Sequence, residues 1–517
     1  MAWKSKLILP FAKRASAKLL YEASHAIAYQ EKIMQALVRQ ARDTQIGREL
    51  GFDTIRSYTD FKNQIPIRDY ERMRLYIDAI VAGKSNILWP GRPRYFAKSS
   101  GTTSGVKYIP ITADSIPNHI GSARYVLFNY AAHNKDASIF DGKMIFLSGS
   151  PVLEMKGDIP NGRLSGIVNH LIPRWIKSNQ LPTYETNCID NWGEKVDRIV
   201  EESLRIGSNA PVPQLKFTPT HGGERPVDMR LISGIPPWVQ MYYERLISAS
   251  GKSTVCDIFP NYSLFVYGGV NYIPYASKLE ELVGRHIDSL ETYPTSEGFI
   301  AYQDSWPYEG LRLNINSGIF FEFVATESLS SANPDRLSLQ EVELNKDYAV
   351  IINSNAGLWG YDIGDTVQFV SKDPYRIVVS GRVEHFISAF GEHVIAKEVE
   401  QTMSETCVAT GIHVTEFTVA PQVNPPDGGA PYHEWFIEFD GEVNDLTVFR
   451  DKLEASMRAQ NIYYRDLREG NVLRPLVITL VQKDRFRKYM ESMGKLGGQN
   501  KLPRLKNDRG IAERLTL

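Results

Sequence analysis

The spacing of apolar residues changes along this 517-residue chain, and the change constrains its fold more than any other feature. Up to about residue 270, extended apolar runs such as 144–147 and 264–267 alternate with stretches of helical spacing such as 237–248. This alternation is typical of a layered α/β body. Between residues 318 and 370 the pattern becomes closely spaced strands, which predict an antiparallel ribbon or a small barrel.

A second unit is predicted to begin near Arg382. Beyond it, Val399, Met403 and Cys407 share one face of a predicted helix, and run 435–439 has the pattern of a strand. A chain of this length is too long for one ordinary core. The sequence therefore predicts a large N-terminal α/β region and a smaller α+β region after it.

Charge and cysteine content narrow the class of partner. Lys+Arg 59 against Asp+Glu 60 leave a net charge of −1, so no basic excess points to nucleic acid or an anionic membrane. A small molecule is the expected partner.

Cysteines 188, 256 and 407 fit neither a disulfide framework nor a CxxC zinc site, which predicts a reducing cytoplasm. No apolar run reaches the roughly 20 residues that span a bilayer, and the N-terminus is interpreted as a surface helix docked on the body.

A loop of small hydroxylated residues follows a predicted strand at 94–98. It reads Ser99-Ser100-Gly101-Thr102-Thr103-Ser104-Gly105-Val106-Lys107. Backbone N–H groups and hydroxyls in such a loop can donate to phosphate oxygens, and the terminal lysine adds positive charge. The Walker A order G-x-x-x-x-G-K-[ST] is absent. Taken alone, the loop is equally well explained as a mobile linker.

Two further segments are predicted to place a carboxylate in a turn. In segment 293–298, YPTSEG, Glu297 stands among hydroxyls and can coordinate magnesium through oxygen. In segment 357–365, GLWGYDIGD, Asp365 can accept both ribose hydroxyls of a nucleotide. A capped turn and a β-turn with a solvated aspartate are the ordinary alternatives.

Two charged segments follow. Segment 381–385, GRVEH, stands at the predicted junction, and the glycine-rich segment 494–504 carries Lys495 and Lys501 on flexible backbone. A charged linker and a basic surface tail explain these residues when each segment is taken alone.

The order and spacing of the motifs resemble the adenylate-forming superfamily, which includes acyl-CoA synthetases, luciferases and peptide-synthetase adenylation domains. In that superfamily a Ser/Thr/Gly phosphate loop precedes Y-x-x-x-E, then Y-x-x-G-D, then G-R-x-[DE] at a hinge, and finally a lysine. The matching positions here are Tyr293 with Glu297, Tyr361 with Asp365, and Gly381-Arg382 with Glu384.

Within the superfamily, the chain most resembles the auxin-responsive acyl acid amido synthetase family, in a compact form such as bacteria carry. The resemblance covers nearly the whole chain and rests on residues 30–47, 58–66, 87–90, 99–110, 356–359 and 499–504. Plant members usually have arginines at the positions of Gly360 and Asp362 and a lysine where His393 aligns. Contacts made by those side chains cannot be carried over.

The resemblance implies an N-terminal domain over 1–380, with a β-barrel-like subregion, and a smaller mobile C-terminal domain over 381–517. It implies that Mg²⁺ and ATP activate a small carboxylic acid as acyl-AMP, and that an amine, by analogy an amino acid, then accepts the acyl group. The implied nucleotide-binding residues are Ser99, Ser100, Gly101, Thr102, Thr103, Tyr293, Thr295, Ser296, Asp365 and Arg382. Lys501 and Glu297 are the implied catalytic residues, with Glu297 as magnesium ligand and Glu384 as hinge residue.

Segment 267–275, YGGVNYIPY, suits a pocket for a flat apolar acid. The candidate pocket residues are Tyr267, Gly268, Gly269, Val270 and Tyr272. Aromatic core packing explains at least half of them.

Two rival functions share these motifs. A ligase that makes a thioester with CoA would use every adenylation residue. A nucleotide- or acyl-binding regulator without turnover is the more distant alternative, because Glu297, Asp365 and Lys501 are all retained. The substitutions at 360, 362 and 393 keep that alternative open. The sequence does not identify the acid, the amine or the oligomeric state.

Overall fold

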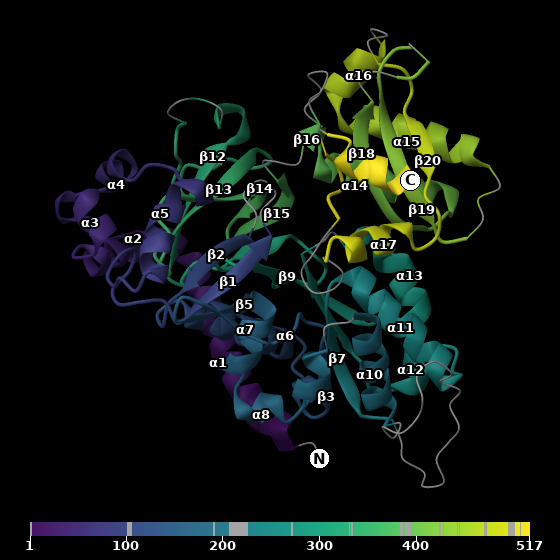
Figure 1. Ribbon diagram of the computed structural model, residues 1–517. Helices are drawn as coiled ribbons and strands as arrows, with labels where there is room; N and C mark the ends of the chain where they lie inside the picture. Colours follow the sequence, from purple (N-terminus) through teal and green to yellow (C-terminus); the bar gives the residue numbers. More distant parts are fainter. Residues whose placement is uncertain are drawn as a thin grey trace.

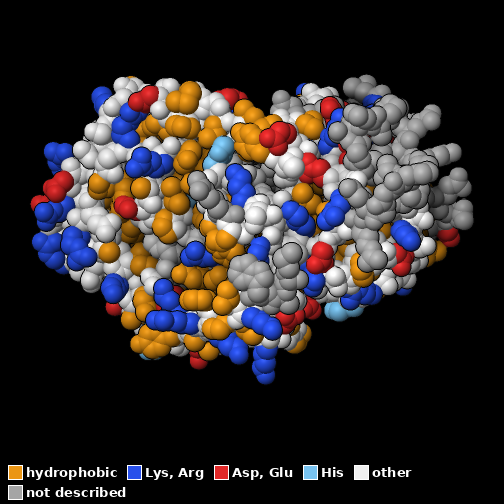
Figure 2. Space-filling view, turned by 90° about the horizontal axis from the view of Figure 1, so that it is seen from below, with side chains coloured by type: hydrophobic (Ala, Val, Ile, Leu, Met, Phe, Trp, Pro, Cys, Tyr) orange, Lys and Arg blue, Asp and Glu red, His pale blue; other side chains and the backbone are white. Residues whose placement is uncertain are grey.

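The computed structural model describes residues 3–100, 106–189, 192–205, 226–269, 272–329, 331, 334–382, 386–387, 394–422, 425–427, 429–441, 443, 445–469, 473–494, 502–506 and 508–516. A large N-terminal part stands beside a smaller C-terminal unit, which lies above helix α13 (Ile273–Val283) in Figure 1. The described residues contain no helix that is both long and apolar enough to cross a membrane. On the face seen from below, basic and acidic side chains are interspersed (Figure 2).

One large sheet organises the N-terminal part. Its strands are β3 (Lys143–Phe146), β6 (Gln180–Leu181), β7 (Met229–Ser233), β8 (Leu264–Gly268), β9 (Asp288–Pro294), β10 (Phe299–Gln303), β11 (Leu311–Leu313), β12 (Ile319–Ala325), β13 (Asp347–Ser354), β14 (Tyr361–Lys372) and β15 (Tyr375–Arg382). They pair in the order β12-β13-β14-β15-β11-β10-β9-β8-β7-β3-β6. Strands β6, β3, β7, β8 and β9 pair in parallel, and the others pair antiparallel.

The expected β-barrel-like subregion is instead one end of this sheet. Strands β12, β13 and β14 form the predicted antiparallel ribbon. Strand β15 then pairs with both β14 and β11, which joins the ribbon to the parallel strands and leaves β12 at the end of the order. No closed barrel forms among the residues that the structure describes, because β15 extends the sheet away from β12.

A second, smaller sheet carries the flanks of the phosphate-loop motif. It contains β1 (Tyr95–Ser100), β2 (Val106–Ile111), β4 (Glu154–Lys156) and β5 (Ile159–Arg163), in the order β2-β1-β5-β4. Strand β1 confirms the strand predicted before the loop. It pairs antiparallel with β2, so that Ser99 lies opposite Lys107.

Helices cover both faces of the parallel strands. Alternate residues of a strand point to opposite faces, and Ile145 and Met144 of β3 accordingly belong to different hydrophobic clusters. Helices α10 (Trp192–Leu204), α11 (Pro236–Ser250) and α13 pack on one face. Helices α1 (Trp3–Ser24) and α6 (Ser122–His133) pack on the other. The N-terminal helix is docked on the body as expected, with Ser16 Oγ donating to Asn129 Oδ1 at 2.8 Å.

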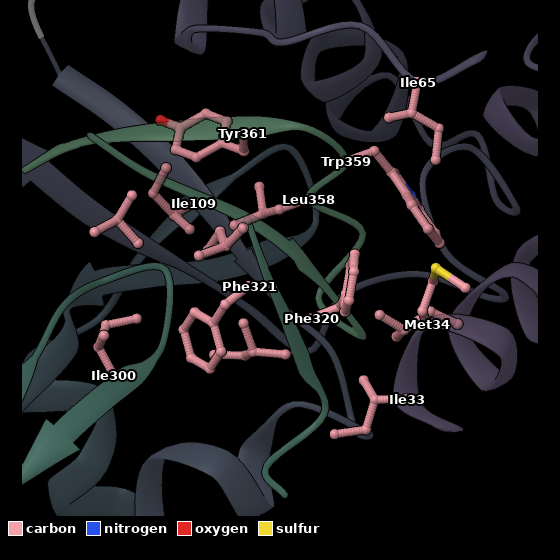
Figure 3. Packing of buried hydrophobic residues seen from close by; sticks show 14 of the residues in the cluster. Ile33, Met34, Ile65, Ile109, Ile300, Phe320, Phe321, Leu358, Trp359 and Tyr361 are labelled. Atoms are coloured by element: carbon pink, nitrogen blue, oxygen red, sulfur yellow. The ribbon is translucent and has the colours of Figure 1, made fainter. Parts of the chain in front are cut away.

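The largest hydrophobic cluster anchors the segment that precedes Asp365. Helix α2 (Ala26–Ala41) buries Ile33 and Met34 here. In Figure 3, Trp359 lies between Ile65 and Met34, close to Phe320. The Trp359 indole N–H donates to the backbone oxygen of Leu88 at 3.0 Å. Core packing therefore fixes the chain directly before strand β14.

The remaining helices of this part are α3 (Gln45–Glu49), α4 (Tyr58–Gln64), α5 (Tyr70–Val81), α7 (Leu164–Leu171), α8 (Arg174–Lys177), α9 (Tyr184–Asn187) and α12 (Val255–Ile258).

The C-terminal unit has its own core. Two hydrophobic clusters consist only of residues from Val394 onward. Its strands are β18 (Val414–Gln422), β19 (Tyr432–Phe439) and β20 (Val477–Leu480), and its helices are α14 (Ala396–Thr410), α15 (Leu446–Gln460), α16 (Ile462–Glu469), α17 (Arg485–Ser492) and α18 (Gly510–Thr516). The predicted helix with Val399, Met403 and Cys407 is present as α14, and the predicted strand at 435–439 is present within β19. A two-stranded ribbon, β16 (Phe386–Ile387) with β17 (Val394–Ile395), precedes them.

Candidate functional site

Two of the predicted motifs meet at one edge of the large sheet. Strands β8 and β9 are parallel neighbours, with Gly268 opposite Thr292, so their carboxyl ends point the same way. In open α/β sheets this is the edge where ligands bind. The residues predicted to line an acid pocket begin at the end of β8, with Tyr267 and Gly268, and the turn with Glu297 follows β9. Tyr293 itself lies within β9, whereas we expected it in a loop.

A hydrogen bond joins the Y-x-x-x-E and Y-x-x-G-D motifs. The Tyr293 hydroxyl donates to Asp365 Oδ2 at 2.6 Å, and the two residues are 7% and 5% exposed. Asp365 lies inside strand β14, opposite Arg382 of β15, and not in the glycine turn where we expected it. The turn comes earlier, where Gly357 and Gly360 adopt positive φ. The sheet, and not the turn, therefore holds the Asp365 carboxylate.

A tight turn positions Glu297. The backbone N–H of Thr295 donates to the oxygen of Gly298 at 2.8 Å, and the Gly298 N–H donates back to Thr295 Oγ1 at 3.2 Å. A Cβ on Gly298 would lie 2.5 Å from Ile319 Cδ1, so a larger residue there would require the Ile319 side chain to move. Directly after the turn, the Phe299 N–H donates to Asn118 Oδ1 at 2.7 Å. The turn is thus held by its own hydrogen bonds and by the contact with Asn118 directly after it.

Two charged groups from other segments act on Glu297. Burial raises the pKa of Glu297, the Asp365 carboxylate raises it further, and Lys107 on β2 opposes the rise. Burial also raises the pKa of Tyr361, and the Glu297 charge adds to that effect. The structure therefore brings Glu297 together with Asp365, Tyr361 and the lysine that ends the phosphate-loop motif.

The donor set is one that magnesium can use with a nucleotide. Over the described part of the chain, no three or more His, Cys, Asp or Glu side chains form a group that could hold a metal ion. Magnesium, however, is commonly bound through one or two carboxylates together with substrate phosphates and waters. Glu297 fits that mode. It is half-buried, and the charge of the Asp365 carboxylate contributes to its raised pKa. A bound cation would offset the repulsion between the two carboxylates.

Several predicted site residues lie outside the described residues. They are Gly101, Thr102, Thr103, Val270, Glu384, His393 and Lys501. The backbones of Ser100 and Arg382 end strands β1 and β15, and their side chains are likewise not described. The described members are Ser99, Tyr293, Thr295, Ser296, Glu297, Asp365, Tyr267, Gly268, Gly269 and Tyr272.

The tyrosines predicted for the acid pocket form a stacked cluster. The rings of Tyr267 and Tyr272 stack at 4.6 Å between centroids, and Phe265 stacks on Tyr267 at 5.4 Å. Tyr267 is buried in the core on the α13 side of the sheet, as the core-packing alternative expects. Gly268 has no room for a side chain, because a Cβ would lie 2.4 Å from the oxygen of Thr292. The glycine brings strands β8 and β9 close together at the edge where the site lies.

Sequence reasoning missed three polar residues near the site. Asn118 supports the Glu297 turn, as described above. Its neighbour His119 is buried, which lowers its pKa to about 4, and its Nδ1 has no hydrogen-bond partner in the part of the chain the structure describes. Arg163 ends β5 opposite Lys98, next to Ser99 in the pairing, and burial lowers its pKa. No motif spacing marked these residues in the sequence.

Three family models match the chain. They are the GH3 family N-terminal domain over residues 15–197, the GH3 family central domain over 313–382 and the GH3 family C-terminal domain over 397–510. Together these matches extend from helix α1 to the first residue of helix α18.

Curated relatives are amido synthetases. The chain is 23% identical to jasmonoyl–L-amino acid synthetase JAR4 of Nicotiana attenuata, over 66% of each chain. It is 22% identical to jasmonoyl–L-amino acid synthetase JAR6 of the same organism, over 92% of this chain and 90% of the relative. Indole-3-acetic acid-amido synthetase GH3.3 of Arabidopsis thaliana is 21% identical over 92% and 88%.

Solved structures share the fold. The AtGH3.15 acyl acid amido synthetase in complex with 2,4-DB superimposes with a TM-score of 0.77 at 14% identity, over 98% of this chain and 96% of that one. A 2-hydroxyisobutyryl-CoA ligase superimposes with a TM-score of 0.50 at 10% identity, over 93% and 91%. The architecture of a large N-terminal α/β part with a smaller C-terminal unit is therefore common to these proteins.

Proposed function

Because the chain belongs to the GH3 family, we propose that it uses ATP to activate a small carboxylic acid as an acyl adenylate and then transfers the acyl group to an amine. The observation that carries the proposal is the buried hydrogen bond from Tyr293 to Asp365, with the Glu297 carboxylate close enough to sense the Asp365 charge. This contact joins the Y-x-x-x-E and Y-x-x-G-D motifs, and the proposal that both bind the nucleotide is supported by the position of the first motif at the sheet edge where open α/β sheets bind ligands.

In the first half-reaction, an oxygen of the acid attacks the α-phosphorus of ATP, the bond to the bridging oxygen breaks, and pyrophosphate leaves. Ser99, Ser100, Thr102 and Thr103 would donate to phosphate oxygens, and Arg382 would contact the nucleotide. Asp365, oriented by the Tyr293 hydroxyl, would accept from the ribose. Lys501 would stabilise negative charge on the acid or the bridging oxygen. Catalysis of this step is then mainly positioning and charge stabilisation.

Magnesium is proposed as the second requirement. Glu297 would hold it, and the ion would supply positive charge to the phosphates. The neighbouring Lys107 adds a fixed positive charge to the same place, since it already lowers the pKa of Glu297 against the effect of burial.

In the second half-reaction, the amine nitrogen attacks the acyl carbonyl, the bond to AMP breaks, and the nitrogen loses a proton. An amino acid is the proposed amine, since the curated relatives are named as synthetases of jasmonoyl–amino acid and indole-3-acetic acid amides. A reducing cytoplasm is the proposed location, which the three free, half-buried cysteines support.

Acid-dependent exchange of labelled pyrophosphate into ATP tests the first half-reaction. We expect exchange with at least one member of a panel of aromatic and aliphatic acids, and none without acid or without Mg²⁺. A chain that binds ATP but shows no exchange with any acid would contradict the proposal and favour a binding protein without turnover.

Product analysis tests the second half-reaction. The protein is incubated with ATP, the preferred acid, and either CoA or a mixture of amino acids, and the products are identified by mass spectrometry. We expect an acyl amino acid. An acyl-CoA product without any acyl amino acid would assign the chain to the thioester-forming ligases instead.

A further inference from the structure

The outer face of helix α1 is both apolar and basic. The helix packs on the body through a face that contains Ala12 and Ala15, which are buried. Residues that follow one another at steps of four and three on the other side are all exposed, namely Leu7, Phe11, Arg14, Lys18 and Tyr21. Leu7 and Phe11 are 58% and 68% exposed. The solvent side of a docked helix is normally polar, so large exposed apolar side chains there mark a surface that another molecule covers.

The same face has an excess of positive charge. The cations of α1 are Lys4, Lys6, Lys13, Arg14 and Lys18. Glu22 is the only acid in the helix, and it is 6% exposed, accepts from Asn316 Nδ2 at 2.7 Å and lies 3.6 Å from Lys18 Nζ. Lys6, Lys13 and Arg14 form no ion pair with any residue that the structure describes. The near-neutral charge of the whole chain therefore conceals a local excess.

Helix α8 extends this surface. Lys4 Nζ donates to Asn179 Oδ1 at 2.9 Å, which ties the start of α1 to the chain just after α8. Trp175 of α8 is 41% exposed, and its ring lies 6.2 Å from that of Phe140, a member of the hydrophobic cluster on which α1 packs. Figure 1 shows the start of α1 and helix α8 together at the bottom of the molecule. In Figure 2, seen from that side, hydrophobic and basic side chains lie next to one another.

This combination of side chains is that of a helix lying in the interface of a bilayer. Such helices join Lys and Arg to Leu, Phe and Trp, and bind more strongly when the lipids are anionic. Apolar side chains enter the boundary between headgroups and acyl chains, cations contact the headgroups, and Trp and Tyr are enriched at that level. Along α1 the two kinds of side chain share one stripe about 20 Å long. Its partner must therefore offer negative charge and an apolar layer over the same area.

We propose that the outer face of α1, together with Trp175 of α8, docks the protein on the anionic surface of a lipid bilayer. The helix lies flat on the membrane, its cations contact lipid phosphates, and Leu7 and Phe11 enter the layer beneath the headgroups. The inner face stays packed on the body. The inference is independent of the proposed function, because docking requires neither ATP nor an acid.

Flotation of the full chain with lipid vesicles tests the proposal. One set of vesicles contains phosphatidylcholine and phosphatidylglycerol in equal parts, and the other contains phosphatidylcholine alone. We expect the protein to float with the anionic vesicles, to be released as the salt concentration rises, and to bind the neutral vesicles weakly. Equal binding to both kinds of vesicle, or binding to neither, would overturn the proposal.

The combined variant Lys6→Gln, Lys13→Gln and Arg14→Gln tests the contribution of charge. We expect its partition coefficient on anionic vesicles to fall about 100-fold, since each cation near an anionic surface contributes about 5-fold. The matched control removes two lysines and one arginine that are exposed elsewhere, in the variant Arg56→Gln, Lys84→Gln and Lys452→Gln. We expect this control to retain most of the binding. An equal loss in the control would show a general effect of net charge and overturn the proposal.

The double variant Leu7→Gln and Phe11→Gln tests the apolar contribution at constant charge. We expect its partition coefficient to fall at least about 10-fold, because less apolar surface enters the interface. The control is Leu75→Gln with Val408→Gln, since these residues are 80% and 84% exposed on other helices. Circular dichroism melting checks that every variant keeps its fold. Unchanged binding of the α1 variant, or an equal loss in its control, would overturn the proposal.

Two further measurements distinguish a membrane from other occupants. A fluorophore sensitive to its environment, attached at Ala17→Cys after the native cysteines are replaced, should shift to the blue on anionic vesicles, whereas one at Val408→Cys should not. A shift at Val408 and not at Ala17 would overturn the proposal. Light scattering without lipid measures the molar mass. A wild-type dimer that Leu7→Gln with Phe11→Gln converts to a monomer would show that a second copy covers the face, and would also overturn it.

Discussion

At the scale of single residues, the candidate site depends on one hydroxyl and two carboxylates. The Tyr293 hydroxyl orients Asp365, and the Asp365 charge contributes to the raised pKa of Glu297. Asp365 is buried within a strand, so an alanine there would leave the Tyr293 hydroxyl without its acceptor. Substitutions that keep the shape of the side chain therefore distinguish an effect on catalysis from an effect on folding better than truncation to alanine does.

We predict that Asp365→Asn and Glu297→Gln each abolish most acid-dependent pyrophosphate exchange. Loss of a charge-assisted contact to ribose or magnesium should cost about 2 to 4 kcal/mol in the transition state. Exchange rates at saturating ATP measure the loss, and circular dichroism melting checks that the fold is kept. Tyr293→Phe should give a smaller decrease, because the carboxylate remains. Wild-type exchange in both carboxylate variants would show that these residues do not bind Mg-ATP.

Gly360 shows why one departure from the plant pattern is structural. Its φ is 58°, and a Cβ would lie 2.3 Å from the backbone oxygen of Pro66. Gly364, four residues on, also has a positive φ of 79° but no neighbour within 4 Å of a Cβ. An arginine at position 360 would require the backbone to move away from Pro66.

We predict that Gly360→Ala destabilises the protein more than Gly364→Ala. Both substitutions strain the left-handed backbone by about 1 to 2 kcal/mol, and only the first adds a clash with backbone. Urea denaturation followed by fluorescence gives the two free energies of unfolding. Equal decreases in the free energy of unfolding would mean that the backbone near Pro66 moves away from the added Cβ without a loss of stability.

At the scale of elements, strand β9 connects the site to the boundary between the two parts. Tyr293 faces Asp365, and Glu291, two residues earlier, lies opposite Tyr267 and faces Glu400 of α14. Burial raises the pKa of Glu291 to about 7, the Glu400 charge adds to the rise, and a hydrogen bond from Tyr308 opposes it. Strand β9 thus carries the proposed nucleotide-binding residue Tyr293 and, at the boundary, an acid whose pKa is raised to about 7.

Glu291 should make stability fall as pH rises. Its pKa is about 7 in the folded chain against 4.5 when unfolded, so between these values the folded state holds a proton that the unfolded state has released. Relative to Glu291→Gln, we expect the wild-type free energy of unfolding to decrease by about 2 to 3 kcal/mol from pH 5 to pH 8. Urea denaturation at both pH values measures this. A constant difference between the two proteins would show that Glu291 is ionised in the folded state throughout.

At the scale of the whole molecule, we propose the division into domains 1–380 and 381–517 with a hinge near Glu384. The C-terminal unit has its own hydrophobic clusters and meets the N-terminal part through polar contacts on α13 and β14. Such an arrangement favours rigid-body rotation, because each core stays intact while the contacts exchange.

We predict that Glu384→Pro retains pyrophosphate exchange and loses most amide formation. Proline fixes φ near −65° and removes an N–H, which should trap one orientation of the C-terminal domain. The two half-reactions are measured separately, with Glu384→Ala as the control for loss of the side chain alone. The opposite pattern would mean that the other pose is trapped, which also supports rotation. Small and equal effects on both half-reactions would contradict the two-pose mechanism.

Local pattern in the sequence was sufficient for most elements, and the resemblance of the motif order to a known superfamily predicted which residues form the site. The helix at 236–250 and the strand at 264–268 follow from the spacing of their apolar residues, since that spacing records which side chains are buried. The motif residues Tyr293, Glu297 and Asp365 were predicted as one site from their order along the chain. Their order could be read because each motif is short and contiguous.

Only the tertiary structure decided which distant segments meet. The sequence does not reveal that β15 pairs with β11, which opens the expected barrel into one end of the large sheet, nor that Asp365 lies in a strand. Asn118 and the Arg504–Tyr275 bond were equally invisible, because each joins residues more than 100 positions apart. Local periodicity reports whether a side chain is buried, whereas its partner is chosen by long-range packing, which leaves no periodic signal in either segment.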